Sequence, residues 1–473
     1  MSDKVKHQQN NLTLLLVVGL SLIAWYFPIT SAIAENAWHL LIIFIATIVG
    51  IILSPLPMGV IALLSILACV LTNTLTLTEC LSGFGDSIVW LVVFAFFISN
   101  GFIKTGLGSR VAYYVLSKIG HSTLGISYAL VIADFVLSPL IPSATARGGG
   151  VIFPIAKAIA KSFSDEEHRG VSSRNGGFIM SVCAQSTVIT STLFITAMAA
   201  NPLVVKLAQN AGYTISWMDW AMAAIVPGVI SLALMPLIIY YLYPPTIKYS
   251  DSAPRIAKEK LAAMGNISMH EIIMIAVFFI LIVLWIKGAE FGLSATTVAL
   301  IGLSILFVTR VINFEDNLAD KSAWHTFIWF ATLVMLSDYL SKFGLMTWVA
   351  SKLQFLFIDT SPINSLIILS LLYFYIHYFF ASTTAHITVL LPTFLVLFIN
   401  AGVPGALAAL FLSFLSTLSA GLTHFGLSSS PIFFGTNYMK TKEWWHIGFV
   451  TSIFYLLIWI FIGGAWWKLL NFW

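Results

Sequence analysis

The chain has 473 residues, of which 59% are hydrophobic and only 9% are charged, and its mean hydropathy is +0.95. A soluble domain carries roughly 25% charged residues because its surface must meet water, so this composition excludes a soluble protein and indicates a chain embedded in lipid. The net charge of +4 gives no reason to expect a nucleic-acid partner. The three cysteines, Cys69, Cys80 and Cys183, lie singly in apolar stretches and fit neither a disulfide framework nor a metal-binding spacing.

The N-terminal segment is short, polar and mildly basic, and no cleavage signature follows the first apolar run. We therefore expect an uncleaved first helix within residues 1–34. A membrane-spanning helix needs about 20 apolar residues, and this pattern predicts eleven spans and an all-α polytopic membrane protein. The predicted spans are residues 12–33, 38–54, 58–73, 87–104, 176–199, 219–242, 269–287, 292–309, 323–341, 403–426 and 446–467.

Two further apolar segments, 124–160 and 362–400, are too long for one crossing and carry polar residues in their middle. The first contains Pro139-Leu-Ile-Pro-Ser-Ala-Thr-Ala-Arg147, and the second contains Ala381-Ser-Thr-Thr-Ala-His386. Non-helical backbone at membrane depth is tolerated where protein or a water-filled cavity surrounds it. We therefore predict two re-entrant hairpins, each formed by two half-helices that meet at a polar tip.

The distribution of Lys and Arg orients the predicted spans. With the N-terminus in the cytoplasm, most basic residues fall in cytoplasmic segments, in agreement with the positive-inside rule. This orientation predicts a cell (inner) membrane protein with its C-terminus outside. It also places the hairpin at 124–160 on the cytoplasmic side and the hairpin at 362–400 on the external side.

An internal repeat divides the chain. Ala62-Leu63 and Thr72 recur after 237 positions; Ser99, Lys104, Gly106-Leu107 and Val111-Ala112 recur after 238; Ser143-x-Thr145-Ala146 recurs after 239. Five crossings separate equivalent positions, so the two halves have opposite orientation, as is typical of secondary transporters. The predicted units are repeat 1 at 35–242, a polar cytoplasmic linker at 243–268 and repeat 2 at 269–473.

The two hairpin tips carry the polar groups that point to a function. Each tip offers hydroxyls beside broken helices, whose free N–H groups favour anions. Each also places a cationic or titratable residue, Arg147 or His386, four residues after its serine. Ionisable residues inside a membrane usually mark a substrate path. A small anion with a carboxylate at each end is the expected complement.

Each half also has a later polar break in a predicted span. The breaks contain Thr190-Ser191-Thr192 with Asn201-Pro202, and Thr423-His424 with Ser428-Ser-Ser-Pro431. Discontinuous helices of this kind present backbone groups to ligands. The structural alternatives stay open: a membrane hydroxyl can bond to its own helix, Arg147 can tie hairpin carbonyls together, and a histidine can simply be packed. We interpret His377 as structural.

Enzyme signatures and ATP sites are absent from the sequence. His270-Glu271 starts an HExxH-like string, but Met274 stands where the second histidine would be. The sequence also lacks a G-x-S-x-G elbow and a Walker A loop. We therefore expect a transporter, not an enzyme, that runs on gradients and carries no cofactor or metal.

At these residues the sequence resembles the divalent anion:sodium symporter family of di- and tricarboxylate carriers. The most specific stretches are Pro142-Ser-Ala-Thr-Ala-Arg-Gly-Gly-Gly-Val-Ile-Phe-Pro154, Ala381–His386 and Gly435-x-x-Tyr438-x-Lys440-x-Lys442-x-x-Trp445. Family members carry Ser-Asn-Thr at both tips, whereas this chain has Ser143-Ala144-Thr145 and Ser382-Thr383-Thr384. The Arg147 and His386 pattern is similar to the exchanger branch of citrate/succinate, tartrate/succinate and 2-oxoglutarate/malate antiporters. His424 replaces a proline that is common in relatives.

The resemblance implies an elevator-type homodimer that exchanges small dicarboxylates without sodium. Arg147 and His386 would compensate substrate charge in place of sodium. The predicted substrate-binding residues are Ser143, Ala144, Thr145, Thr190, Ser191, Thr192, Ser382, Thr383, Thr384, Thr423 and His424. A sodium-coupled di/tricarboxylate symporter is the main alternative. An anion channel and a membrane-embedded enzyme are the others.

Overall fold

The computed structural model describes residues 3–26, 33–53, 55–166, 171–345, 348, 362–380 and 382–473. The elements before the predicted linker are α1 (Asp3–Trp25), α2 (Glu35–Leu53), α3 (Met58–Leu71), α4 (Leu77–Cys80), η1 (Ser82–Gly85), α5 (Ser87–Thr105), α6 (Leu107–Ile119), α7 (Thr123–Leu137), η2 (Thr145–Ile152), α8 (Phe153–Glu166), α9 (Val171–Thr192), η3 (Ile195–Ala197), α10 (Ala200–Asn210) and α11 (Trp217–Leu242). The later elements are α12 (Ser252–Met264), α13 (Met269–Lys287), η4 (Gly288–Phe291), α14 (Ala295–Val308), α15 (Phe314–Leu318), α16 (Lys321–Lys342), α18 (Pro362–Tyr375), η6 (Ile376–Phe379), α19 (Thr383–Asn400), α20 (Gly405–Ser419), η7 (Ala420–Leu422), α21 (Ser430–Phe434), α22 (Thr441–Leu457), η8 (Ile458–Gly463) and α23 (Gly464–Leu469).

The helices confirm the predicted fold class of an all-α polytopic membrane protein. A helix lies at each of the predicted spans. Within the described ranges, seven helices are long and apolar enough to cross a membrane. Residues 27–32, Ser54, Ala381 and the repeat match at Val349-Ala350 lie outside the described residues.

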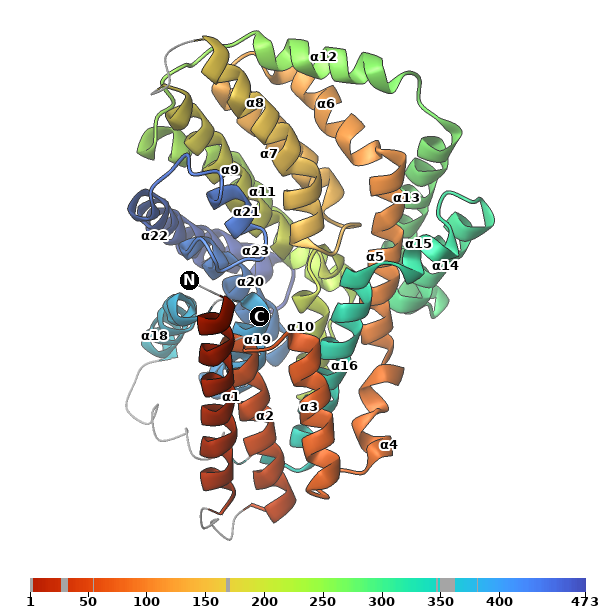
Figure 1. Ribbon diagram of the computed structural model, residues 1–473, viewed down its shortest axis with the longest axis vertical. Coiled ribbons are helices and arrows are strands. Elements are labelled where there is room, and N and C mark those ends of the chain that lie inside the picture. Colours follow the sequence, from red (N-terminus) through yellow and green to blue (C-terminus); the bar gives the residue numbers. More distant parts are fainter. Residues whose placement is uncertain are drawn as a thin grey trace.

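Among the described residues, three helices of more than ten residues were not predicted: α6, α10 and α12. All three contain polar or charged residues, so a search for apolar spans does not detect them. In Figure 1, α12 lies across one end of the molecule, over α6 and α8. Arg110 of α6 forms an ion pair with Glu271 at the start of α13 and donates to the carbonyls of Met264 and Gly265 at the end of α12. The predicted linker is therefore partly a helix fixed to the bundle.

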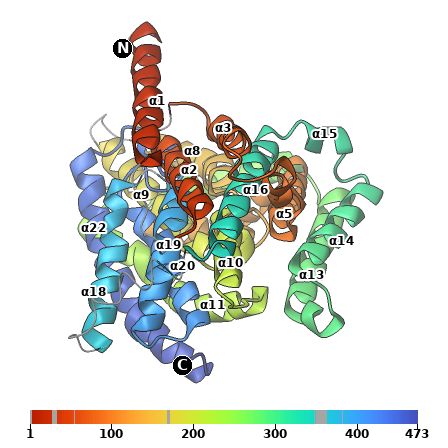
Figure 2. The same cartoon turned by 90° about the horizontal axis from the view of Figure 1, so that it is seen from below.

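Helices from the two sequence halves pack against one another. α5 contacts α14 and α16, α3 contacts α16, and α9 contacts α20 and α21. In Figure 2, α13 and α14 lie on one side of the molecule, and α18 and α22 lie on the opposite side. Residues separated by more than 200 positions therefore meet in the core.

Several local backbone features recur at the spacing of the predicted repeat. Asn73 and Arg310 are 237 residues apart, and both adopt positive φ, at 53° and 58°. Gly106 and Gly344 are 238 residues apart and both have φ of 74°. Non-glycine residues with positive φ are uncommon, so the matched positions support the repeat. The opposite orientation of the halves in a membrane stays a prediction.

Two helix starts also resemble each other, although they are 234 positions apart and not 237–239. The Asp86 side chain caps α5 by accepting from the Ile88 amide. The Asp320 side chain caps α16 by accepting from the amides of Ser322 and Ala323. In each case the tryptophan four residues after the cap donates its indole N–H to a carbonyl six residues earlier, at 3.0 Å. The capping aspartates and tryptophans are therefore used in the same way in both halves.

Both predicted polar tips coincide with interrupted helices. The arms α7 and η2–α8 are separated by residues 138–144, and the arms α18–η6 and α19 are separated around residues 380–382. Figure 1 shows α7 and α8 extending from the α12 end toward the middle of the molecule. The tip residues thus lie between packed helices instead of in an outer loop.

Candidate functional site

The first tip is built by prolines, a serine cap and a glycine run. Pro139 and Pro142 lack amide donors, so the helix cannot continue through them. The helix starts again where the Ser143 hydroxyl accepts from the Ala146 amide at 3.1 Å. The first turns, η2, have π-helical geometry. This geometry is rare in proteins overall, and where it occurs it is often at a functional site. A Cβ on Gly148 would lie 3.0 Å from the Thr187 hydroxyl, so the missing side chain allows close packing on α9.

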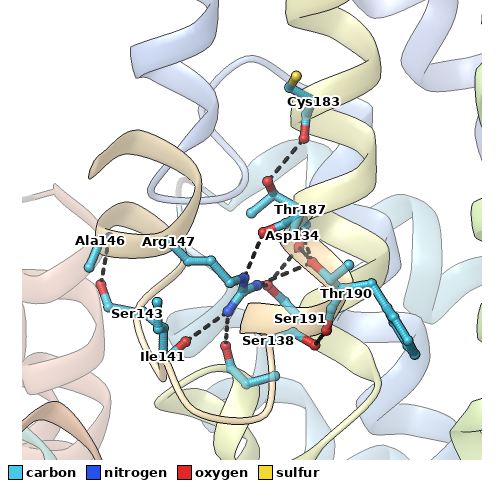
Figure 3. Close-up of polar contacts among 12 residues, drawn as sticks. Asp134, Ser138, Ile141, Ser143, Ala146, Arg147, Cys183, Thr187, Thr190 and Ser191 are labelled. Carbon is cyan, nitrogen blue, oxygen red and sulfur yellow. Dashed lines mark hydrogen bonds and ion pairs between the residues drawn. The ribbon is translucent and has the colours of Figure 1, made fainter. Parts of the chain in front are cut away.

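Arg147 is fully buried, and a network of oxygens surrounds its guanidinium (Figure 3). Nε donates to Asp134 Oδ1 at 2.8 Å, and one terminal nitrogen donates to the carbonyls of Ile141 and Ala197, both at 2.8 Å. The other terminal nitrogen donates to Ser191 Oγ at 2.8 Å and lies 3.3 Å from Thr190 Oγ1. The guanidinium is therefore fixed by partners on four segments: α7, the tip residues 138–144, α9 and η3.

Asp134 neutralises the charge of Arg147. Its carboxylate is 1% exposed, and its second oxygen accepts from the Thr190 hydroxyl at 2.7 Å. Removing one partner of a buried ion pair leaves an uncompensated charge and is strongly destabilising. The predicted free positive charge at the first tip is thus paired within the protein in this conformation.

Sequence reasoning missed Asp134, although a signal was present. It is an acidic residue within the apolar segment 124–160, and an intramembrane carboxylate needs a partner. Asp134 stands on α7 and Arg147 on η2, the two arms of one hairpin. Folding the arms together places the two charges in contact.

The second tip is chemically different. His386 is fully buried, and its Nε2 donates to the Tyr373 carbonyl at 3.0 Å. Its ring contacts aromatic side chains and a second histidine, with centroid distances of 4.6 Å to Tyr373, 5.3 Å to Phe380 and 4.9 Å to His377. No carboxylate takes part in this set of contacts. His386 is therefore not the counterpart of Arg147 in its bonding.

The remaining tip residues fall into two groups. Thr383 is buried, and its hydroxyl donates to the Gly426 carbonyl at 3.2 Å, which joins the tip to the break after α20. Ser143, Ser382 and Thr384 are half-buried, and Thr145 is exposed. Ala144 is buried and presents no polar side chain. The partly accessible hydroxyls are the groups free to meet a ligand.

The break after α9 is held by an asparagine. Asn201 Nδ2 donates to the carbonyls of Ser191 and Phe194 at 2.8 and 2.9 Å, which satisfies the broken helix end. The Thr192 hydroxyl donates back to Ile189, one turn earlier in its own helix. Among the three predicted hydroxyls of this break, Thr190 and Ser191 therefore join the Arg147 network, and Thr192 does not.

The break after α20 is held from the other half of the chain. Gln185 of α9 donates to the Gly421 carbonyl at 2.9 Å and accepts from the Tyr455 hydroxyl at 2.9 Å. All three groups are buried, and sequence reasoning did not single out Gln185 or Tyr455. The hydroxyl of Thr423, two residues beyond Gly421, is buried and has no hydrogen-bond partner among the described residues. It is thus available to a bound molecule.

His424 stands at the edge of an aromatic cluster. The Trp445 indole donates to His424 Nδ1 at 3.1 Å, so the neutral ring carries its proton on Nε2. The ring centroids of His424 and Phe434 are 4.6 Å apart. His424 is half-buried, and its Nε2 is the ring nitrogen left for a ligand.

Comparisons with known proteins agree over nearly the whole chain. The profile of the family described as "Sodium:sulfate symporter transmembrane region" matches residues 8–473. Dicarboxylate transporter 1, chloroplastic, of Arabidopsis thaliana is 47% identical over 464 residues, covering 97% of this chain and 83% of that protein. The putative malate transporter YflS of Bacillus subtilis is 47% identical over 461 residues, covering 97% and 96%.

Two more distant proteins extend the comparison. Inner membrane protein YbhI of Escherichia coli is 35% identical over 468 residues, covering 97% of this chain and 98% of that protein. Among solved structures, the Alcanivorax borkumensis YdaH transporter matches with a TM-score of 0.54 and 12% identity over 98% of each chain. At that identity, the structural match is a likeness of fold alone.

Proposed function

We propose a function on the premise that this chain belongs to the divalent anion:sodium symporter family, whose transmembrane region spans residues 8–473. The chain transports small dicarboxylates of the succinate, malate and 2-oxoglutarate class across a membrane. It exchanges one dicarboxylate for another and does not use sodium. Relatives that are 47% identical and are named dicarboxylate and malate transporters support the substrate class.

The observation that carries sodium independence is the oxygen cage around Arg147. Two backbone carbonyls, one carboxylate and two hydroxyls surround the guanidinium. Oxygen atoms of these kinds are the ligands that hard cations take. In this proposal the side chain of Arg147 supplies the positive charge that a symporter would take from solution. Because the guanidinium already occupies the space between these oxygens, a sodium ion cannot bind there.

Asp134 changes the electrostatic argument for exchange. Because it neutralises Arg147, the empty first tip carries no net charge, and charge at this tip does not prevent the empty carrier from crossing. Unsatisfied polar groups provide another barrier. Within the part of the chain that the structure describes, the hydroxyls of Thr423 and Ser429 are buried without hydrogen-bond partners, and such a group costs about 1–3 kcal/mol. A dicarboxylate oxygen that accepts from them would favour the loaded carrier.

The transport cycle is proposed to be of the elevator type within a homodimer. The moving part would contain the two hairpins with α9, α10, α20 and α21, and the remaining helices would form the scaffold. Ion pairs would cross the junction between the two parts and would have to break during the movement. Lys206 of α10 bonds to Asp86 at the start of α5 and to Asp338 near the end of α16, at 2.8 and 3.1 Å. We also propose a cell membrane location with the N-terminus in the cytoplasm and the C-terminus outside.

Counterflow in liposomes tests the proposal. Purified protein is reconstituted into vesicles loaded with succinate, malate, 2-oxoglutarate or buffer, and uptake of radiolabelled succinate is followed with and without sodium. Uptake is expected in vesicles loaded with a dicarboxylate, with equal rates in sodium and in choline. Uptake into empty vesicles that depends on an inward sodium gradient would establish a symporter instead. Non-saturable flux in every vesicle type would indicate a channel.

A further inference from the structure

Two fully buried histidines lie behind the second tip. His377 is in η6, and His386 is in the first turns of α19. Their ring centroids are 4.9 Å apart and the ring planes are inclined by 64°. Because each imidazole can bind one further proton, the pair is a cluster of titratable groups inside the molecule.

Among the described residues, three of the four ring nitrogens of this pair form no well-aligned hydrogen bond. His386 Nε2 donates to the Tyr373 carbonyl, but His386 Nδ1 and both nitrogens of His377 are unpartnered and buried. Buried polar atoms of native proteins are normally satisfied, and each exception calls for an explanation. The Gly426 backbone lies beside His377 but forms no well-aligned hydrogen bond with it, so the His377 ring is held less firmly than the ring of His386.

Within the described ranges, no counter-charge contacts the pair, and the carboxylate of Glu35 is exposed. The packed elements contribute these titratable groups: Tyr373 and Tyr375 of α18, Tyr378 of η6, Lys206 of α10, Glu35 and His39 of α2, and His424 of the break after η7. The Tyr373 and Tyr375 hydroxyls bond to Ser416 and Ser452, His39 stacks on Trp25, and Lys206 is held by two aspartates. Among the described residues, no carboxylate contacts either histidine.

The pair adjoins the groups proposed to bind substrate. Thr383 donates to the Gly426 carbonyl, and a Cβ placed on Gly426 would come within 3.0 Å of His377 Nε2. Gly426 follows the break that contains Thr423 and His424. The second tip, the break after α20 and the histidine pair therefore meet at one point of the backbone.

We propose that His377 and His386 together form a proton-binding site, which takes up one proton when a dicarboxylate dianion binds at the second tip. This inference rests on the proposed function. A lone imidazolium in a buried place without a counter-charge is unfavourable, and two adjacent imidazoliums are more so. The arriving dianion supplies the missing negative charge. One proton then converts a ring nitrogen from an acceptor into a donor.

Proton binding and dicarboxylate binding are consequently linked in both directions. If the dianion raises the proton affinity of the pair, the proton raises the affinity for the dianion by the same factor. Affinity should fall by up to about tenfold for each pH unit above the range in which the pair binds its proton. In this proposal His377, which precedes the tip in η6, accepts the proton.

The test measures binding of 2-oxoglutarate to the purified full-length protein by calorimetry near pH 7, in two buffers of different ionisation enthalpy. The difference between the two heats gives the number of protons taken up. The wild-type protein is expected to take up about one proton per bound dianion. His377→Gln should bind 2-oxoglutarate without proton uptake and with little dependence on pH. His446→Gln, which changes an exposed histidine of α22, should behave as the wild type.

Two results would overturn the assignment: binding by the wild type without proton uptake, or unchanged proton uptake in His377→Gln. If His377→Gln loses its monodisperse size-exclusion peak, His377→Asn is measured in its place, and the wild-type buffer dependence alone still decides whether a proton is bound. Absence of binding by the wild type would refute the proposed function itself. The two failures are thereby told apart, because proton uptake is read only where binding heat is present.

Discussion

Removing the guanidinium of Arg147 should create a sodium site. In Arg147→Ala, the carboxylate of Asp134 keeps its bond from Thr190 but loses its cation. Two backbone carbonyls and the Ser191 hydroxyl then face the vacated space. A carboxylate, carbonyls and hydroxyls around a space of this kind form a suitable ligand set for a monovalent cation.

The size of the effect follows from the burial of the pair. Both side chains are at most 1% exposed, so breaking the pair should lower the free energy of unfolding by about 3–5 kcal/mol. Sodium that binds only the folded variant returns stability by mass action, about 2.7 kcal/mol at a concentration 100 times its dissociation constant. Sodium should therefore restore a large part of the loss, whereas choline should restore none.

Thermal unfolding in detergent measures this directly, with sodium chloride and choline chloride at equal ionic strength. Arg147→Ala should have a lower Tm than the wild type in choline and should regain part of it in sodium. Arg110→Ala is the matched control, because it breaks an ion pair with Glu271 at the partly exposed end of the bundle. Its Tm should respond equally to both salts. An Arg147→Ala variant as stable as the wild type, or one indifferent to sodium, would refute the account of the cage.

Three other changes test contacts around the site. Gln185→Leu leaves the Gly421 carbonyl without its donor, which should cost about 1–3 kcal/mol and raise the KM for dicarboxylate exchange; an unchanged KM would contradict the proposed role. Gly149→Val should slow exchange because its side chain would displace the end of the Ile432 side chain, and an unchanged rate would argue against this packing of η2. Burial opposes the charge of Lys206, but neighbouring carboxylates hold its pKa above the ordinary value. Its contribution to stability should persist up to about pH 10 and be lost above that range, so Lys206→Met should lower the Tm equally at about pH 6 and pH 8.

Hydropathy and turn residues were sufficient to predict the helical class and the interruptions of the hairpins. The apolar runs are long, and Pro139 and Pro142 stop a helix for reasons that do not depend on neighbours. The helices α6, α10 and α12 were missed because their stability comes from contacts with other elements. α6, for example, is fixed through the bonds of Arg110 to α12 and α13. An amphipathic helix of this kind gives no signal in a search for membrane spans.

The charge state of the site could not be predicted from residue types alone. Arg147 was correctly identified as a residue of the first tip, but its partner lies 13 positions earlier on the opposite arm. Only the fold shows that the two charges cancel. The same limit applies to Gln185 and Tyr455, which lie 270 positions apart. Tyr455 donates to Gln185, and Gln185 in turn donates to the Gly421 carbonyl.

The contrast between the tips gives each a different part in the proposed cycle. At the first tip, a fixed cation is paired with a fixed carboxylate, and neither charge is free to vary with substrate. At the second tip, the titratable groups are histidines without a carboxylate partner, so their charge can follow the charge of the bound anion. A repeat that places equivalent residues at two tips therefore does not require equivalent chemistry. If the charges at the first tip cancel, the first tip does not distinguish the loaded carrier from the empty one. That distinction must then come from the second tip and from the unsatisfied hydroxyls beside it.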